Sequence, residues 1–199
     1  LALTAWTISL IIQLLIHSTP FIEKSKKEKY SSIVFRKISL FILIDCNPFW
    51  NLRLIGERPP KEAFKSPKIV VVAHIKIRIK FVKIENKKFN HKSNIDAVLV
   101  ARFIPPEVRY IAKHVLFKFP IGGTNMTLAG DIPVVLKNKN GTFYVEEKDK
   151  IKLTDRSVKF LENGGSLVIF PEGKRIRTNE LGKFKDGAFI FAQKSGADI

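Results

Sequence analysis

The stretch Asn90-His91-Lys92-Ser93-Asn94-Ile95-Asp96 holds side chains that could do acid–base chemistry. Ser93 and Asp96 are three residues apart and precede the apolar run 97–100, which is the spacing of a capping box at a helix start. His91 lies in the turn before this cap, so the chain can curl until the Asp96 carboxylate faces the imidazole. A carboxylate on one ring nitrogen leaves the other nitrogen free as a base. Taken alone this pattern is a weak signal for a catalytic His–Asp pair, and a helix start that happens to follow a histidine is the commoner interpretation.

A second polar cluster, Phe170-Pro171-Glu172-Gly173-Lys174-Arg175, follows the apolar run 166–170. A glycine turn at the end of a buried strand, followed by cations, is where α/β folds bind anions. In such a basic loop we expect Glu172 to orient a neighbouring side chain or to accept a substrate hydroxyl. The alternative is a surface turn with solvated charges.

The composition is that of a folded domain with a strongly basic surface. The chain has 199 residues, 45% of them hydrophobic, which suffices for one domain with a core plus a small appendage. Its formal net charge of +17 favours anionic partners, namely nucleic acid, anionic lipid or a phosphorylated substrate. Cys46 is the only cysteine, so no disulfide can form within the chain, and we expect it to be a packing residue.

Residues 1–47 are expected to form a pair of membrane-associated helices. Residues 1–16 carry no charge, and the basic run 24–29 follows them. A bilayer is crossed by roughly 20 apolar residues, and lysines beside it are attracted to an anionic leaflet. The second apolar segment, 33–44, is shorter and fits a helix that dips into one leaflet. The alternative for both segments is a pair of core helices in a soluble protein.

Residues 48–199 read as an α/β domain with a mostly parallel central sheet flanked by helices. Prolines punctuate 48–67, where a short strand at 52–55 is expected. Beyond it, strand and helix patterns alternate, as in α/β layer folds. The expected strands are 69–73, 131–136 and 166–170, and the expected helices are 95–103, 113–117, 155–162 and 186–194. Thr154 or Asp155 would cap the third helix, and the glycines at 164–165 and at 196 would end the last two.

Together, the block at 90–96 and the block at 170–175 resemble the glycerolipid acyltransferase family, in particular 1-acyl-sn-glycerol-3-phosphate (lysophosphatidate) acyltransferases. That family carries NHxSxxD and, downstream, FPEGTR. Lys113 and the segments 120–123 and 128–134 are similar to the family's intermediate block. The segments 182–189 and 49–56 also match its pattern, so the resemblance covers most of the chain from about residue 48.

The resemblance implies acyl transfer from a thioester, either acyl-CoA or acyl carrier protein, to a glycerol hydroxyl. His91 would be the general base, and Asp96 would hold and polarise it. The acceptor phosphate and glycerol would be bound by Glu172, Gly173 and Arg175. Asn90, Ser93 and Pro171 complete the two motifs. No metal and no bound cofactor is implied.

Two departures concern the residues that would bind the acceptor. The family often has an arginine where this chain has Leu136; the adjacent Lys137 is the expected substitute, together with Lys113 as a further substrate-binding cation. An ammonium lacks the bidentate fork of a guanidinium. Lys174 replaces the threonine of FPEGTR, and a further proline-rich block is expected beyond Ile199, so we interpret the chain as a fragment truncated at its C-terminus.

A third departure is the ribbon HIKIRIKFVKIENKKF, residues 74–89, which alternates apolar and basic side chains. If it is removed, the strand 69–73 joins the block 90–96 in family register. The ribbon lacks the aromatic stacking pattern of a single-strand nucleic-acid binder. We therefore interpret it as an insertion into residues 48–199, and its Lys/Ile/Asn/Phe content resembles a translated intron. The rival interpretation is a genuine loop of this lineage.

The predicted function is acylation of 1-acyl-sn-glycerol 3-phosphate to phosphatidic acid in phospholipid biosynthesis. The expected partners are the lipid bilayer, lysophosphatidate and acyl-CoA, with no nucleic acid, and the expected location is a membrane, of the endoplasmic reticulum rather than the plastid. The alternatives are a catalytically impaired acyltransferase-like membrane protein, or an enzyme that acylates glycerol 3-phosphate or another lysophospholipid. A basic nucleic-acid-binding protein would rest on charge alone, and the uncharged N-terminal segment argues against it.

Overall fold

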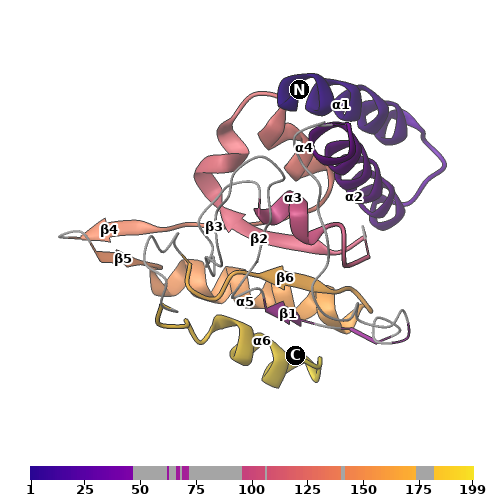
Figure 1. Cartoon of the computed structure of the whole chain (residues 1–199). Helices are drawn as coiled ribbons and strands as arrows, with labels where there is room; N and C mark the ends of the chain where they lie inside the picture. Colours follow the sequence, from indigo (N-terminus) through magenta and orange to yellow (C-terminus); the bar gives the residue numbers. More distant parts are fainter. Residues whose placement is uncertain are drawn as a thin grey trace.

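A parallel sheet lies at the centre of the molecule (Figure 1). The computed structural model describes residues 1–46, 62, 66–67, 69–71, 96–105, 107–139, 142–173 and 182–199. The sheet has the strand order β1-β6-β2-β3, and each neighbouring pair is parallel. The strands are β1 (Ile69–Val71), β6 (Leu167–Ile169), β2 (Arg109–Lys113) and β3 (Ile132–Val134). The predicted α/β class with a parallel sheet is confirmed.

One face of the sheet is covered by the two C-terminal helices, α5 (Glu147–Glu162) and α6 (Gly187–Ser195) (Figure 1). Side chains alternate along a strand, so Leu167 and Ile169 point to this face while Val168 points to the other. Leu167 and Ile169 pack with Leu161 of α5 and Phe191 of α6. This apolar layer is the larger of the two core clusters among the described residues.

The opposite face is covered by the short helix α3 (Asp96–Val100) and the turn that follows it. Val100, Ile104 and Val108 pack there against Tyr110 of β2 and Val168 of β6. Val70, Ala97 and Phe170 border the same cluster. Because this face also receives the N-terminal helices, the sheet is enclosed on both sides, as parallel sheets generally are.

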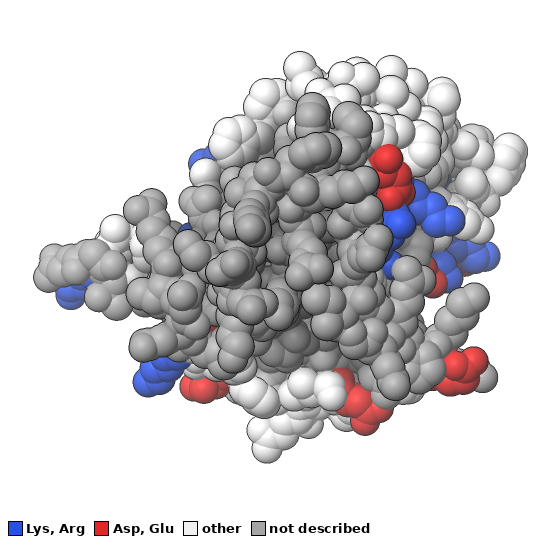
Figure 2. Space-filling model, in the orientation of Figure 1, with Lys and Arg blue, Asp and Glu red and all other residues white. Residues whose placement is uncertain are grey.

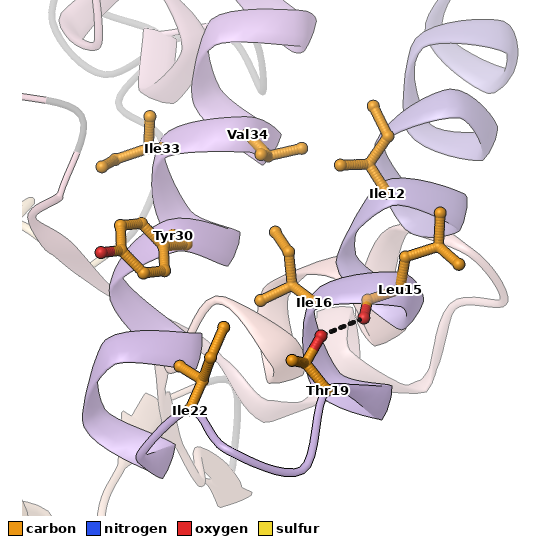
Figure 3. Close-up of a pocket in the computed structure, with 8 residues that line it drawn as sticks. All are labelled: Ile12, Leu15, Ile16, Thr19, Ile22, Tyr30, Ile33 and Val34. Carbon is orange, nitrogen blue, oxygen red and sulfur yellow. Dashed lines mark hydrogen bonds between the residues drawn. The ribbon is translucent and has the colours of Figure 1, made fainter.

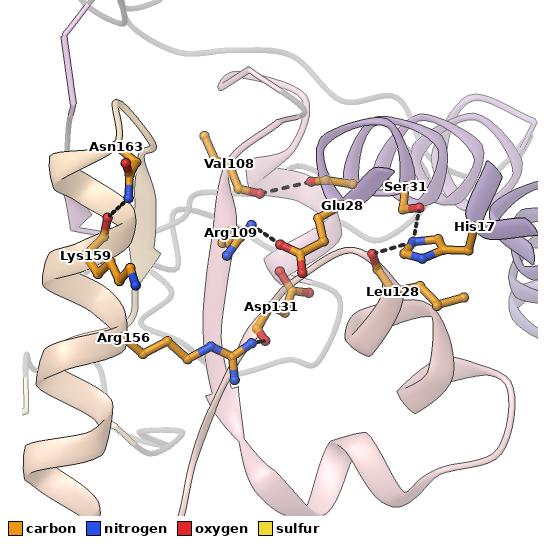
Figure 4. A network of polar contacts seen from close by, with 11 residues as sticks. His17, Glu28, Ser31, Val108, Arg109, Leu128, Asp131, Arg156, Lys159 and Asn163 are labelled. Carbon is orange, nitrogen blue, oxygen red and sulfur yellow. Dashed lines mark hydrogen bonds and ion pairs between the residues drawn. The ribbon is translucent and has the colours of Figure 1, made fainter. Parts of the chain in front are cut away.

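The N-terminal helices, α1 (Ala2–Ser18) and α2 (Lys24–Leu40), form an antiparallel pair that packs on α4 (Gly122–Leu128). A π-helical turn, Phe41–Asp45, continues α2. The pair is joined to the sheet by polar contacts (Figure 4), among them the Ser32 hydroxyl donating to the Val108 carbonyl at 3.1 Å and the ion pair of Glu28 with Arg109. The guanidinium of Arg109 lies 3.9 Å from the ring centroid of Phe160 on α5.

Helix α1 buries two polar side chains and exposes most of its large apolar ones. Ala5, Ser9 and Gln13 follow a four-residue spacing and are buried. The Gln13 amide donates to the Ser9 hydroxyl at 2.9 Å and to the side-chain carbonyl of Asn125 on α4. The opposite face exposes large apolar side chains, namely Leu1, Leu3, Ile8, Ile11, Ile12, Leu14 and Leu15. A surface helix of a soluble protein normally shows the reverse pattern.

Two expectations about this pair are corrected by the structure. The second helix is not confined to the apolar segment 33–44, because α2 begins at Lys24 and takes in the basic run as its first turns. Across the described residues, no helix combines the length with the apolar character that a membrane crossing needs. The prediction of a transmembrane helix is therefore not supported.

Other element boundaries also differ from expectation. Helix α5 begins at Glu147 and not near Asp155. The sequence did not indicate its first turns because they carry mainly charged side chains with no apolar period. The 3₁₀ helix His114–Lys118 replaces the predicted helix at 113–117. Strand β2 and the antiparallel hairpin of β4 (Lys137–Lys139) with β5 (Thr142–Tyr144) were not anticipated. Gly196 ends α6 with a left-handed φ of 70°, as predicted.

Candidate active site

The carboxyl ends of the four parallel strands meet at one edge of the sheet. Val71 of β1 lies beside Ile169 of β6, and Lys113 of β2 lies beside Val134 of β3. Ligands of open α/β sheets bind outside this edge. The segments that leave it include both sequence blocks, the one after β1 that leads to Asp96 and the one after β6 that contains Glu172.

The block after β6 forms a tight turn. The Gly173 amide donates to the Phe170 carbonyl at 3.0 Å, and Gly173 has a left-handed φ of 62°. A residue with a Cβ is strained at such an angle, which accounts for glycine here. The turn holds Glu172 with its side chain almost fully buried, at 3% exposure. The end of β6 and the turn at Gly173 therefore fix the position of the buried Glu172 carboxyl.

The segment 182–185 closes over this turn. The Gly182 amide donates to Glu172 Oε1 at 3.2 Å, and the Lys185 amide donates to the Pro171 carbonyl at 2.9 Å. The second carboxylate oxygen of Glu172, Oε2, is buried and has no hydrogen-bond partner among the residues that the structure describes. A buried carboxylate oxygen is normally satisfied, so this one is suited to accept a hydrogen bond from a ligand.

Lys185 was missed as a candidate site residue. A Cβ placed on Gly173 would lie 3.1 Å from Lys185 Cε and 3.4 Å from its Nζ, so the lysine side chain crosses directly over the glycine turn. Its ammonium supplies a cation beside Glu172 for an anionic ligand. The available signal in the sequence is that Lys185 is a cation within the segment 182–189, which resembles the family's pattern.

Helix α3 brings the first block next to the second. Asp96 is its first residue, and the next residue, Ala97, packs in the cluster that contains Val70 of β1 and Phe170 at the start of the glycine turn. The start of α3 and the start of the glycine turn therefore border the same apolar cluster on this face of the sheet. Asn90, His91, Ser93 and Arg175 lie outside the described residues, as do the ribbon 74–89 and the expected strand 52–55.

The two lysines predicted to bind substrate have different surroundings. Lys113 is the last residue of β2, at the carboxyl edge, and its Nζ lies 5.3 Å from the ring centroid of Phe143. Lys137 lies on the exposed hairpin, where its Nζ is 2.5 Å from Glu146 Oε1. This hydrogen bond raises the pKa of Lys137 and lowers that of Glu146. The ammonium of Lys137 is therefore already paired with the Glu146 carboxylate, and a substrate phosphate would have to compete with that carboxylate.

The chemistry that this edge can support is the binding of an anionic molecule with hydroxyl groups. Glu172 offers a buried acceptor oxygen, Lys185 and Lys113 offer cations, and the turn offers close backbone approach. Within the described part of the chain, no group of His, Cys, Asp and Glu side chains is arranged to hold a metal ion.

Comparisons with known proteins agree with this geometry. A model of the Acyltransferase family matches residues 89–199. The chain is 31% identical over 110 residues to a chloroplastic 1-acyl-sn-glycerol-3-phosphate acyltransferase of Arabidopsis thaliana, covering 55% of this chain and 28% of that protein. It is 33% identical over 106 residues to the 1-acyl-sn-glycerol-3-phosphate acyltransferase of Helicobacter pylori, covering 53% of this chain and 41% of that protein. The match thus spans less than half the length of these relatives.

A solved structure shares the fold. The crystal structure of the 1-acyl-sn-glycerophosphate acyltransferase PlsC from Thermotoga maritima superimposes with a TM-score of 0.55 at 21% identity, covering 92% of this chain and 61% of that one. The likeness extends over almost the whole chain. Since the family match takes in the helix of Asp96, the glycine turn of Glu172 and the segment of Lys185, this chain belongs to the Acyltransferase family.

Proposed function

We propose that the protein transfers an acyl group from a thioester, acyl-CoA or acyl carrier protein, to the free hydroxyl of 1-acyl-sn-glycerol 3-phosphate. The observation that carries the proposal is the juxtaposition at the carboxyl edge of the sheet. Helix α3, which starts at Asp96, and Phe170, which begins the turn that buries Glu172, border the same apolar cluster, and one Glu172 oxygen has no hydrogen-bond partner among the described residues. Relatives that share these segments are named as enzymes with this activity.

In the proposed mechanism, His91 takes the proton of the acceptor hydroxyl as its oxygen attacks the thioester carbonyl carbon. Asp96 holds the imidazole and stabilises it when it is protonated. The tetrahedral intermediate then expels the thiolate, which receives the proton from His91, and the new ester is released. The thioester is already activated and the base is a side chain, so the reaction needs neither a metal nor a bound cofactor.

The acceptor would be held by the glycine turn and the cations around it. Glu172 Oε2 would accept a hydrogen bond from the glycerol part, while Gly173 allows close approach and Arg175 with Lys113 would bind the phosphate. Lys185 is added to this set because its side chain lies over Gly173. Lys137 is kept as a weaker candidate, since a phosphate would compete there with Glu146.

The proposed place of action is a membrane surface. The support comes from α1, whose exposed face is built of Leu and Ile while Ser9 and Gln13 are buried. The upper part of the molecule in Figure 2, where Figure 1 places α1, is drawn almost free of charged side chains. Exposed lysines at 24, 26 and 29 begin α2 and suit an anionic leaflet. We keep the endoplasmic reticulum as the proposed membrane and the plastid as the alternative, since the Arabidopsis relative is chloroplastic by name.

The test is an assay of acyl transfer from acyl-CoA to lysophosphatidate in mixed micelles, comparing the chain with its His91→Ala variant. A positioned general base contributes about 10²–10⁴-fold, so the variant should lose that factor while its sedimentation with vesicles stays unchanged. Unchanged turnover in His91→Ala would falsify the proposed mechanism. Glycerol 3-phosphate and other lysophospholipids as acceptors test the alternative substrates.

A second candidate function is that of a catalytically impaired acyltransferase-like membrane protein. It is favoured by Leu136 in place of the family's arginine and by the ribbon 74–89 before His91. In that case the chain would still bind lysophosphatidate or the thioester, measurable by calorimetry, without producing phosphatidic acid.

A further inference from the structure

A groove of about 450 Å³ runs between α1 and α2 (Figure 3). All of its walls belong to α1, to the turn after it and to α2, so it is separate from the carboxyl edge of the sheet. The lining residues are Ile12, Leu15, Ile16, Thr19, Ile22, Tyr30, Ile33 and Val34. Its size lies within the range of about 300–1,000 Å³ that is common for pockets of small ligands.

The walls of the groove suit a hydrocarbon chain. They are branched aliphatic side chains with the ring of Tyr30, and they contain no charged group. The Thr19 hydroxyl is already bonded to the Leu15 carbonyl at 3.1 Å, as Figure 3 shows, so it offers little to a polar ligand. Water in such a groove would find few partners, and an apolar ligand would displace it favourably.

Cations mark one end of the same surface. Lys26, Tyr30 and Val34 are spaced by four residues, so they share one face of α2, and Lys29 with Ile33 forms the neighbouring row. Lys26 and Lys29 are exposed. The ion pair of Lys26 with Glu23 is 3.7 Å long, and both side chains are more than 60% exposed, at 64% and 72%. A pair of this kind is weak and leaves the ammonium open to another anion.

The positive charge of Lys26 and Lys29 beside the apolar groove therefore favours a ligand that combines an anionic group with an apolar chain. A ligand with a long apolar chain and an anionic head would place the head at Lys26 and Lys29 and the chain along the groove beyond Tyr30, against Ile33, Val34 and Ile12. The ring of Tyr30 lies between these two regions, and an aromatic ring with a polar tip is well suited to such a boundary. Phospholipids have this chemistry, and Figure 3 shows the apolar side chains of α1 and α2 that would line the chain.

We propose that this groove binds one acyl chain of an anionic phospholipid, with the lipid phosphate held by Lys26 and Lys29. The site is distinct from the acceptor site near Glu172, and it adds a defined bound lipid to general contact with a membrane. The inference rests on the proposed membrane location but not on the acyl-transfer chemistry.

The test is native mass spectrometry of the whole chain after extraction from vesicles into mild detergent. Two vesicle preparations are compared, phosphatidylcholine alone and phosphatidylcholine mixed with an equal amount of phosphatidylglycerol. We expect the chain to retain a single phosphatidylglycerol and to retain phosphatidylcholine at least about tenfold less, since each lysine contributes to the attraction.

Groove filling tests the apolar part. Ile16→Trp and Val34→Trp put an indole ring where the acyl chain would lie, and both should abolish lipid retention. The matched control is Ile8→Trp, on the exposed face of α1 outside the groove, which should retain the lipid. Equal retention in Ile16→Trp, Val34→Trp and the unaltered chain overturns the proposal.

Charge removal tests the headgroup part without disturbing packing. The double variant Lys26→Gln/Lys29→Gln should lower phosphatidylglycerol retention by about tenfold or more. The control Lys152→Gln/Lys194→Gln removes the same charge from exposed positions on α5 and α6 and should change nothing. Equal losses in the two double variants would show a nonspecific charge effect and overturn the headgroup assignment.

A catalytic variant separates this inference from the proposed function. His91→Ala should lose transfer and keep the bound lipid, whereas Ile16→Trp should lose the lipid at the groove. If the unaltered chain sediments with vesicles but carries no lipid after extraction, the groove site is wrong while the membrane location stands.

Discussion

The guanidinium of Arg36 on α2 forms a buried ion pair with the carboxylate of Asp131, the residue before β3, although 95 positions separate them in sequence. Asp131 Oδ1 also accepts the Tyr110 amide of β2 at 2.9 Å, and the guanidinium lies 4.4 Å from the centroid of the Tyr110 ring. Burial raises the pKa of Asp131, and Arg36 opposes that shift. One buried carboxylate thus joins the N-terminal helix pair to two strands of the central sheet, beside the contacts in Figure 4.

Replacing Arg36 with leucine should strongly destabilise the fold. The variant leaves Asp131 buried without its cation, and breaking a buried pair in this way costs about 3–5 kcal/mol. The measurement is the free energy of unfolding from urea denaturation followed by circular dichroism. Lys37→Gln, at the exposed next position, is the control and should change the free energy by less than about 0.5 kcal/mol. Similar stabilities for the two variants would show that the pair contributes little.

Glu172→Gln should reduce activity with little loss of stability. The amide oxygen can still accept the Gly182 hydrogen bond, so the turn is retained, while the charge of the free oxygen Oε2 is lost. A hydrogen bond to a charged group contributes about 1.5–3 kcal/mol, so its loss corresponds to about 10- to 100-fold in kcat/KM. The assay varies lysophosphatidate and compares kcat/KM with the melting temperature. A variant with full kcat/KM would remove Glu172 from the proposed acceptor site.

Much of the sheet could be predicted because it follows from short apolar runs bounded by breakers. β1, β3 and β6 lie inside the predicted strands, and Gly196 marked the end of α6. The sequence did not predict the elements whose secondary structure is determined by tertiary contacts. The strand β2 begins and ends with charged residues, and α4 contains two glycines, so neither has a strong local signal.

The candidate site was predictable in its motifs and not in its contacts. The turn at 170–173 was predictable from the sequence, because Pro171 and Gly173 follow an apolar strand. The crossing of Lys185 over Gly173 depends on a chain reversal that no local pattern encodes. In the same way, Gln13 meets Asn125 across 112 positions, and only the folded chain reveals that α1 turns its polar side inward.

Gly173→Ala should disturb the site more than an equivalent change elsewhere. The φ of 62° is unfavourable for a residue with a Cβ by about 1–2 kcal/mol, and the added methyl would lie 3.1 Å from Lys185 Cε. Gly187→Ala is the matched control, because its new Cβ meets only Phe191 at an ordinary 3.7 Å and lies in the first turn of α6. We expect lower stability and lower transfer activity for Gly173→Ala, and unchanged or higher stability for Gly187→Ala, in parallel thermal melts.

The Glu146 carboxyl should titrate below its ordinary pKa of 4.5 because Lys137 donates a hydrogen bond to it. A carboxyl with a lowered pKa in the fold stabilises the hairpin fully above its ordinary pKa, and this contribution is lost as pH falls through the lowered value. The check is an NMR titration of the Glu146 side chain. Lys137→Gln should move the midpoint back up, and an unchanged midpoint would contradict the pairing.

Deletion of residues 74–89 should leave an intact catalytic block. Strand β1 ends at Val71 beside Ile169, and the family match begins at residue 89, so the ribbon lies between a sheet strand and the His91 block. If the ribbon is a retained intron, the mature transcript lacks its codons, and sequencing across the codons for Ala73 and Asn90 will show this directly. The shortened chain should then transfer acyl groups at least as fast as the long one, because His91 would follow the strand in family register. A message that contains these codons, together with a shortened chain that loses activity, would establish the ribbon as a working loop beside the active site.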